Sequence, residues 1–440
     1  MNKIFLALAS VLAATALAPE ASAVPSFARQ TSLTCADCHT QHFPVLSSFG
    51  RNFKATGYTM MGTQGKIEGK RLSLPEVLNA SIVLKLRYQK DNTAGVADTS
   101  TAAAKLGNGQ LQFPDEFSLF FGGRIAENTA FLLEGNLFAS GPFVASFKMP
   151  FTSELGGFRL SAIPFTTDAL GVGYGYELSS GGVSRANRWA EPRRETSAIQ
   201  YNADLGIDGG AATGLTLVAQ NNMGYINLTR WAATFLPGEA NANRNSSALN
   251  SNYIRIAATP TLANWPMVVG VGKMSGSSFA GGAQTFDPVG KAIITGQVVD
   301  TQQTFFDLQA QGKIADKELG VYLQYAIAPA TLNGNAYNSS VSATDGSIEN
   351  KIGNPDRRAT TVGIDCTVIP QVLSLGAAYR RAQNGDAAAV NGDNAVTLTA
   401  VYDLAQNVSL HLNHSQYSGT AHQAAGAQTR LTTFMLEAAW

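Results

Sequence analysis

Two cysteines and a histidine stand together near the start of the chain. Residues 34–42 read TCADCHTQH, so Cys35, Cys38 and His39 fit the pattern C-x-x-C-H, the attachment sequence for c-type haem. Two thiols three positions apart on one helical turn bond to the vinyl groups of the porphyrin, and the histidine that follows becomes the proximal iron ligand. The pattern predicts one covalent haem c held by Cys35, Cys38 and His39.

Two other uses of these side chains fit the sequence less well. A redox disulfide between Cys35 and Cys38 would be expected beside a thioredoxin-like βαβ pattern, and the surrounding residues do not form one. A structural zinc site would separate its cysteine pair from its histidine pair by about a dozen residues or more, whereas His39 and His42 follow Cys38 closely. Haem attachment is therefore the favoured interpretation.

The sequence leaves the distal ligand of the haem iron open. His42 lies one turn from His39 on the same side of the ring, so it cannot easily reach the opposite face. Met60 and Met61 follow a predicted helix and the turn residue Gly57, and this distance would let the chain return over the distal face. A thioether ligand would raise the haem potential. Met60 and Met61 are alternative candidates, and apolar packing is the other interpretation of both.

A short amphipathic helix is predicted after the motif, starting at Pro44. Its apolar face is marked by recurrence at i, i+4 and i+8, in Val45, Phe49 and Phe53. Arg51 and Lys54 lie off this face, where they would meet haem propionates or solvent. The unit around the motif, residues 24–74, is too small to bury much core alone and needs the haem or a neighbour to hold it.

The first 23 residues predict export. Asn2-Lys3 is a short positive start, IFLALASVLAATALA is an apolar run, and Ala21-Ser22-Ala23 has the small residues of a cleavage site. The run is short for a membrane-spanning helix, and no later stretch reaches the roughly eighteen continuous apolar residues that such a helix needs. We expect a signal peptide over residues 1–23, which agrees with haem attachment because that step follows export.

Composition narrows the class of protein. Lys and Arg together number 31, as do Asp and Glu, so the net charge is zero and a basic nucleic-acid surface is not expected. Charged residues make up 14% of the chain, below the roughly 25% of an ordinary soluble protein. This composition fits a chain in which apolar and polar residues alternate.

From about Pro75 the hydrophobic period changes to two. Apolar side chains alternate with polar or small ones in residues 82–89, 319–327 and 408–413. A barrel with lipid outside and a wet or plugged lumen inside demands this pattern, because only a closed barrel satisfies every strand hydrogen bond within a bilayer. A soluble two-sheet sandwich also alternates.

Connection lengths favour the membrane barrel, because short periplasmic turns and long outer loops are typical of it. The long polar stretches are 90–112, 179–195, 226–250, 276–300, 330–356, 383–393 and 418–428. Tight turns are predicted near Glu127-Asn128, Asp208-Gly209, Ala263-Asn264, Asp316-Lys317, Pro370-Gln371 and Ala405-Gln406. The chain ends TRLTTFMLEAAW, and this alternating strand with a terminal aromatic resembles the last strand of bacterial outer-membrane barrels.

The number of strands must be even if the chain leaves from and returns to the periplasm. The segments give roughly sixteen strands if residues 140–165 hold one long or irregular strand. A barrel of that size leaves an interior wide enough for water or a plug. We therefore expect a mainly β protein: a 16-stranded antiparallel transmembrane β-barrel over residues 75–440, with the small α-helical c-type haem domain of residues 24–74 plugging its lumen.

Other reactive side chains are given structural roles. Cys366 should face outward from a strand as an apolar filler without a partner. His411 is predicted to face the lumen, and His414 and His422 to lie near or in an outer loop. Lumen-side charges are expected to hold the plug, and these are Lys85, Arg87, Arg124, Glu134, Arg255, Asp307 and Arg380.

The N-terminal segment carries a family resemblance. The stretch PSFARQTSLTCADCHTQHFPVLSSFGRNFKATGY (Pro25–Tyr58), followed by a barrel to an aromatic C-terminus, resembles the fused cytochrome–porin family of iron-oxidising bacteria. Its specific parts are Phe27-Ala-Arg-Gln-Thr, the haem motif, and Phe49-Gly-Arg-x-Phe-Lys-x-x-Gly-Tyr. The family is characterised as monohaem outer-membrane ferrous-iron oxidases. The resemblance implies Cys35, Cys38 and His39 as the haem residues, extracellular Fe(II) as electron donor, and a periplasmic cytochrome or copper protein as acceptor.

These features together predict an oxidoreductase that works as an electron conduit in the outer membrane. A redox centre in the lumen of a lipid-embedded barrel would pass single electrons from extracellular Fe(II) to a periplasmic carrier. One alternative is an electron-exporting or broad-donor porin-cytochrome. The other is a diffusion porin in which the haem plug is structural.

Overall fold

The computed structural model describes residues 26–42, 45–70, 72–93, 106–138, 143–178, 211–233, 235, 248–280, 284–286, 292–294, 297–338 and 355–440. The predicted signal peptide, residues 1–23, lies outside the described residues. The turn predicted near Asp208-Gly209 lies outside them as well.

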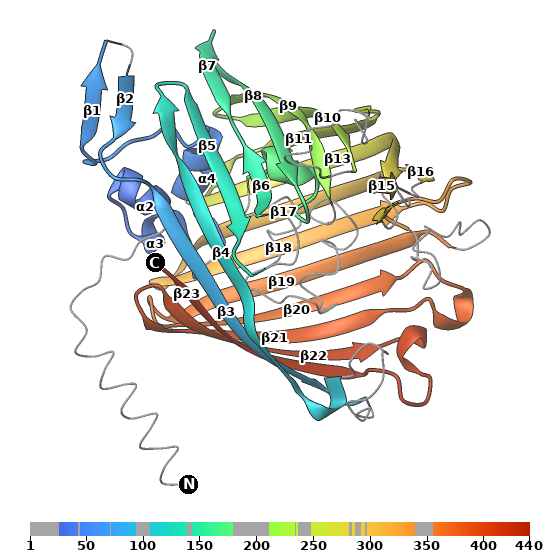
Figure 1. Cartoon of the computed structure of the whole chain (residues 1–440). Helices are drawn as coiled ribbons and strands as arrows, with labels where there is room; N and C mark the ends of the chain where they lie inside the picture. Colours follow the sequence, from blue (N-terminus) through green and yellow to red (C-terminus); the bar gives the residue numbers. More distant parts are fainter. Residues whose placement is uncertain are drawn as a thin grey trace.

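The main body is a closed antiparallel β-barrel (Figure 1). Its strand segments are β3 (Ala80–Asp91), β4 (Gln110–Ala126), β5 (Thr129–Asn136), β6 (Val144–Lys148), β7 (Phe151–Leu155), β8 (Phe158–Thr167), β9 (Ala212–Asn221), β10 (Gly224–Ala232), β11 (Ser251–Ala258), β12 (Thr261–Leu262), β13 (Trp265–Ala280), β16 (Gln297–Asp300), β17 (Gln303–Ile314), β18 (Lys317–Ala328), β19 (Arg357–Ile369), β20 (Leu373–Gln383), β21 (Asn394–Ala405), β22 (Val408–Ser418) and β23 (Arg430–Ala439). The pairs β6 with β7, β11 with β12 and β16 with β17 are successive pieces of one strand, since both pieces pair with the same neighbour, and sixteen strands result. The expectation of a mainly β, 16-stranded antiparallel barrel is confirmed.

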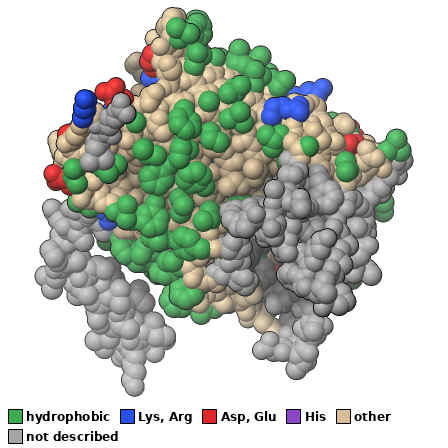
Figure 2. Space-filling model, turned by 45° about the horizontal axis from the view of Figure 1, so that its top comes forward, with side chains coloured by type: hydrophobic (Ala, Val, Ile, Leu, Met, Phe, Trp, Pro, Cys, Tyr) green, Lys and Arg blue, Asp and Glu red, His purple; other side chains and the backbone are tan. Residues whose placement is uncertain are grey.

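The alternation of side chains has the predicted polarity. On β21, for example, Val396 and Leu398 are exposed on the outside, whereas Thr397 and Thr399 are buried inside. Lumen-facing positions throughout the barrel include buried charges and amides, while apolar side chains face outward. Figure 2 shows hydrophobic side chains gathered over the middle of the strands. This apolar outer surface suits the hydrocarbon region of a membrane. Strands of outer-membrane barrels alternate in this way, with apolar side chains outside and polar side chains inside.

The short connections all lie at one end of the barrel, here called the turn end, and the longer ones lie at the other, the loop end. Turns at 263–264 and 315–316 have both central residues at positive φ, which is the hairpin geometry that matches strand twist. The predicted turns at Glu127-Asn128, Ala263-Asn264 and Pro370-Gln371 are confirmed. Those predicted at Asp316-Lys317 and Ala405-Gln406 fall one residue earlier and one residue later, at 315–316 and 406–407.

Two sequence predictions about connections are wrong. Residues 140–165 do not hold one strand, because Gly156 and Gly157, both at positive φ, turn the chain between β7 and β8. The long stretch predicted over 226–250 starts too early, because β10 continues to Ala232 after a tight turn at 222–223. In the second case the polar residues Asn227 and Thr229 made residues 226–232 look like a loop, although they lie on the lumen-facing side of a strand.

Closure of the barrel depends on the last strand. β23 pairs with β3, and Ile82 and Trp440 exchange backbone N–H···O bonds of 2.8 and 3.0 Å. Phe434 and Trp440 are exposed on the outward face, as the C-terminal pattern predicts. Because the strand number is even, the segment that precedes β3 and the C-terminus lie at the same end (Figure 1).

Within the described residues, three short helices precede the barrel: α2 (Ser26–Thr31), α3 (Cys35–Cys38) and α4 (Ser48–Ala55). A small hairpin of β1 (Lys66–Gly69) and β2 (Leu72–Pro75) follows them. The predicted helix start at Pro44 is wrong: the Ser47 hydroxyl caps the helix by accepting from the Gly50 N–H at 3.1 Å, and Leu46 lies in a β-bridge with His39. Across the described residues, no helix is both long and apolar enough to cross a membrane.

Small elements complete the described chain at the loop end. They are the 3-10 turns η1 (Leu106–Asn108), η2 (Val172–Gly175), η4 (Ala388–Val390) and η5 (Thr420–His422), and the two-stranded pair β14 (Gln284–Phe286) with β15 (Ala292–Ile294).

The outward face yields a stability prediction. Leu398 is 56% exposed near the middle of β21, so we expect Leu398→Arg to place a cation near the bilayer midplane and to destabilise the barrel by about 2–4 kcal/mol. Thr432→Arg on the outward face near the loop end should cost about 0–1 kcal/mol, since depth sets the penalty. Guanidinium unfolding in lipid vesicles measures both, and equal costs would contradict the assigned lipid face.

Candidate functional site

The C-x-x-C-H motif begins with a capped helical turn. The Thr34 backbone N–H and hydroxyl both donate to Asp37 Oδ2, at 2.7 and 2.9 Å. These bonds form a capping box at the start of α3, in which Cys35 and Cys38 occupy one turn. The His39 N–H donates to Cys35 O at 2.8 Å. The spacing of the motif therefore folds locally as thioether attachment requires, with both thiols on one turn and the histidine directly after it.

Helix α4 supports this turn through direct backbone contact. The Ser47 N–H donates to Cys38 O at 2.8 Å, and the Ser47 hydroxyl donates to Asp37 O at 2.9 Å. A Cβ atom at Gly50 would lie 2.1 Å from Cys38 O, so only glycine permits the two helices to approach this closely. Helix α4 ends at Ala55, and Gly57 follows the C-cap residue Thr56 with a φ of +66°, the left-handed geometry that often ends a helix.

The two thiols are half-buried, and neither forms a disulfide. Burial raises the pKa of Cys35 and raises that of Cys38 to about 11, so both remain protonated at neutral pH. The Cys35 thiol donates to Asn407 Oδ1 at 3.5 Å, which brings the turn between β21 and β22 against the motif. Two accessible reduced thiols on one turn, followed by an imidazole, form a donor set that fits covalent haem c.

Residues of the barrel wall at the turn end form hydrogen bonds with the motif segment. The Gln41 N–H donates to Glu318 Oε2 at 2.9 Å, and the Arg124 N–H donates to Gln30 Oε1 at 2.9 Å. Arg51 donates to Leu46 O at 3.0 Å and also to Gln311 on β17. Arg51 is 6% exposed, and burial lowers its pKa to about 10, so the prediction of a solvated face for Arg51 is wrong.

His42 also forms a polar contact with the barrel wall at the turn end. Its Nε2 is 2.9 Å from Asp365 Oδ2 on β19, and both side chains are buried. The His42 ring is 6.3 Å from the ring of His411, and His411 Nε2 lies 3.0 Å from Ser409 Oγ and 3.4 Å from Glu437 Oε2. His42 thus anchors the motif segment to the wall, and the prediction that His411 faces the lumen is confirmed.

The two methionine candidates are placed beside an aromatic cluster. Met60 packs against Phe27, Phe53, Tyr58 and the strand residue Ala130, and its carbonyl accepts from Gln30 at 2.7 Å. Met61 is half-buried next to it. The observed contacts of Met60 are those of apolar packing, and a distal-ligand role for Met60 or Met61 stays a prediction.

The remaining histidines and the third cysteine are positioned as predicted. Cys366 is half-buried on the outward-facing row of β19. His414 Nδ1 lies 2.9 Å from Thr432 Oγ1 near the loop end of β22, and His422 lies in η5 with Nε2 3.0 Å from Asp393. Within the described part of the chain, His, Cys, Asp and Glu side chains form no group of three or more that could hold a metal ion.

A second segment enters the lumen from the loop end, and the sequence analysis missed it. Residues 168–178 follow β8, and they are buried from Gly171 to Leu178. Glu177 accepts from Tyr225 Oη at 2.8 Å and from Asn227 Nδ2 at 3.0 Å, and it pairs with Arg255. Arg255 also donates to Asp307 at 2.8 and 2.9 Å. Arg255 and Asp307, which were predicted to hold the N-terminal plug, bind this loop segment instead.

The two inserted segments meet. Ala55 of α4 belongs to one buried cluster with Tyr176 and Leu178 of the loop segment. Lys148 on β6 lies over the rings of Tyr58 and Tyr174, at 5.2 and 4.3 Å, and donates to Tyr174 O at 2.8 Å. The signal in the sequence was the run ALGVGYGYEL (169–178), which is more apolar than a solvent-exposed loop should be.

No protein-family model and no curated protein matches the sequence. Among solved structures, OprB of Pseudomonas putida is 8% identical with a TM-score of 0.52, and the match covers 82% of this chain and 94% of that one. The outer-membrane channel DcaP of Acinetobacter baumannii is 10% identical with a TM-score of 0.47, covering 82% and 97%. OmpT of Vibrio cholerae is 11% identical with a TM-score of 0.44, covering 86% and 100%. The likeness to OprB shows the fold alone, which is a closed β-barrel of the porin kind.

The contact between α3 and α4 gives a second prediction. Gly50→Ala should raise helix propensity by about 1 kcal/mol, yet the added methyl would overlap Cys38 O, so we expect a net destabilisation of the motif segment of about 1–3 kcal/mol. Faster proteolysis between residues 24 and 74 and a lower haem content after co-expression with a cytochrome c maturation system would measure it. Ser48→Ala, on the exposed side of the same helix, is the matched control, and identical behaviour of the two variants would refute the close contact.

Proposed function

We propose that this protein is an outer-membrane electron conduit. In this proposal Cys35 and Cys38 bind haem c covalently and His39 binds its iron. The donor is extracellular Fe(II), and a periplasmic cytochrome or copper protein is the acceptor. The supporting observation is that the capped C-x-x-C-H turn lies at the turn end of a closed barrel, beside Asn407 in the turn between β21 and β22.

Different residues of the chain would bind, orient and position the haem. When bound, the haem would supply a one-electron couple between ferric and ferrous iron, with its potential set by the axial ligands and their surroundings. Gly50 and Ser47 would fix the orientation of the motif turn, and His42 with Asp365 would hold the segment at a constant depth. The turn end faces the periplasm in outer-membrane barrels, so a periplasmic carrier would reach this site directly.

The occupied lumen also supports electron transfer over solute passage. Side chains of the motif segment contact lumen-facing residues near the turn end, and the loop segment that carries Glu177 packs against Ala55 of the motif segment. Diffusion of a solute through a barrel needs a continuous open path. Electron transfer needs only redox groups that are closely spaced. A plugged barrel is compatible with the second requirement.

A diffusion porin with a structural haem plug is the second candidate. The likeness to the OprB fold favours it more directly than it favours iron oxidation, because nothing in that likeness concerns haem or iron. An electron-exporting or broad-donor porin-cytochrome would use the same parts with another partner.

Stopped-flow spectroscopy separates these functions. Purified oxidised protein mixed with Fe(II) should develop the absorption of reduced haem, because extracellular iron is the proposed donor. Cys35→Ser/Cys38→Ser should lose covalent haem and the signal, whereas Cys366→Ser, which alters the outward-facing thiol, should keep both.

Conductance in planar bilayers completes the test. The wild-type protein should show little steady conductance if the motif segment and the loop segment close the lumen. Large conductance without haem reduction by Fe(II) would establish the diffusion porin and end the iron-oxidase proposal. Reduction by other donors, but not by Fe(II), would favour the broad-donor alternative.

A further inference from the structure

Exposed basic side chains gather on the outward face at the loop end of the barrel. Strand alternation directs each of them away from the lumen, and they are Lys90 (β3), Arg230 (β10), Lys273 (β13), Arg358 (β19), Arg381 (β20) and Arg430 (β23). Figure 2 shows Lys and Arg side chains beside the hydrophobic surface near this end. Arg230 and Arg358 donate to the amides of Asn252 and Gln383, and none of the six forms an ion pair within the described residues.

Charge at the turn end is arranged differently. There Arg159 Nε is 2.8 Å from Glu154 Oε1, and Lys317 follows Asp316 in the chain. At the loop end the acidic residue on the strand neighbouring Lys273 is Asp300, which is half-buried and accepts from Asn333 Nδ2 at 3.3 Å. Within the described residues, the outward face at the loop end therefore carries six exposed cations that form no ion pair, with Asp356 as an exposed acidic neighbour two positions before Arg358.

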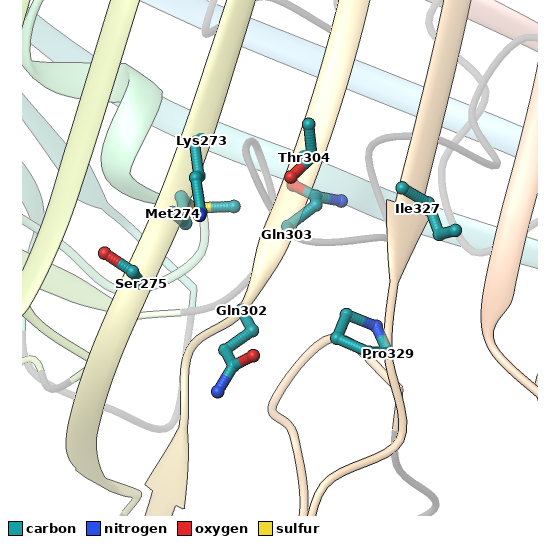
Figure 3. Close-up of a pocket in the computed structure, with 8 residues that line it drawn as sticks. All are labelled: Lys273, Met274, Ser275, Gln302, Gln303, Thr304, Ile327 and Pro329. Carbon is teal, nitrogen blue, oxygen red and sulfur yellow. The ribbon is translucent and has the colours of Figure 1, made fainter.

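Strand register aligns part of this charge into a row. Lys273 pairs with Thr304, Thr304 with Ile327, and Ile327 with Arg358, so two cations are separated by three strand spacings, roughly 14 Å. A cavity of about 450 Å³ opens beside Lys273, with Ser275 and Gln302 as further polar lining (Figure 3). Figure 3 shows Lys273 on β13, Thr304 on β17 and Ile327 on β18, with Pro329 just beyond the end of β18.

An apolar row lies two residues nearer the middle of the membrane. Val271 pairs with Phe306, and Phe306 pairs with Tyr325, and all three side chains face outward. They are 52%, 37% and 38% exposed. The outward face therefore carries hydroxyl, amide and cationic groups nearer the loop end, at the level of the membrane surface. The apolar row of Val271, Phe306 and Tyr325, here called the apolar tier, lies directly below them at the depth of the acyl chains.

We propose that this surface, the Lys273–Arg358 row with its cavity, binds the phosphorylated headgroup of an outer-leaflet glycolipid. The phosphates would meet Lys273 and Arg358, the sugar hydroxyls would meet Ser275, Gln302 and Thr304, and the acyl chains would lie on Val271, Phe306 and Tyr325. Long loops place this end at the outer leaflet, where the bacterial lipid is a phosphorylated glycolipid. Basic side chains at a membrane surface attract such anionic headgroups.

Charge complementarity and depth both favour a lipid over a soluble anion. A free phosphate would use the cations but leave the apolar tier in contact with bulk lipid, whereas a glycolipid occupies both tiers. This inference rests on the outer-membrane barrel and is independent of any haem.

Binding of lipid A to the full-length protein in phosphatidylcholine nanodiscs tests the proposal. Lys273→Gln/Arg358→Gln should weaken lipid A binding by about tenfold or more, given a contribution on the order of 1 kcal/mol from each cation. Lys66→Gln/Lys313→Gln, which removes two exposed lysines at the turn end, should leave the affinity unchanged. The resistance of each folded barrel to SDS before heating checks that the variants retain the fold.

Two further arms use the wild-type protein and so need no variant to fold. Lipid A without its phosphates should bind at least tenfold more weakly, and added NaCl should weaken binding of the phosphorylated form. Equal binding by the two variants, or by the two lipids, would overturn the proposal. Displacement of lipid A by inorganic phosphate at an equal concentration would overturn it too, since the apolar tier would then contribute nothing.

Discussion

The hydrogen bond between the first and last strands is the constraint on which this structure depends. In hydrocarbon, unpaired backbone N–H and C=O groups cost several kcal/mol each, so a membrane sheet must have no open edge. Here β23 joins β3, and the bonds between Ile82 and Trp440 complete the ring at the very end of the chain. Closure by an even number of antiparallel strands then dictates that the residues before β3 emerge at the turn end. The C-x-x-C-H segment is next to the lumen mouth for this topological reason.

The lumen tolerates polar contacts that a protein core would not. Arg255 between Glu177 and Asp307 forms buried ion pairs of the kind whose desolvation cost rivals their attraction, and His42 with Asp365 is a buried polar pair. Their value here is positional, because each fixes an inserted segment at one depth and one rotation. Removing one partner would leave an uncompensated buried charge, which is far costlier than the pair itself. The two inserted segments are consequently located by electrostatics, and the barrel wall supplies most of the partners.

Much of the barrel could be predicted because its physics is periodic. Alternation at residues 82–89 and 408–413 predicts strands with one apolar face, and the connection lengths with the terminal Trp440 favour a closed barrel over a two-sheet sandwich. The predicted boundaries of helices and strands were wrong where hydrophobic periodicity did not set them. The helix start moved from Pro44 to Ser48 because Ser47 supplies the cap, and the pair Gly156-Gly157 turns the chain inside what looked like one strand. The long-range pairs that seat the motif, such as His42 with Asp365, have no sequence signal because their partners are chosen by barrel register.

The glycines of the motif segment show how a short pattern can encode a three-dimensional requirement. Gly50 is needed because Cys38 O occupies the space that a side chain would take, and Gly57 is needed because its φ is positive and Thr152 lies 2.8 Å from where its Cβ would be. One glycine therefore sets the approach of α4 to the thiol-bearing turn, and the other sets the approach of α4 to the barrel wall. The intervening helix acts as a rigid spacer between wall and motif. A segment of this size has little core of its own. Its geometry is defined because contacts with the rigid barrel fix its position.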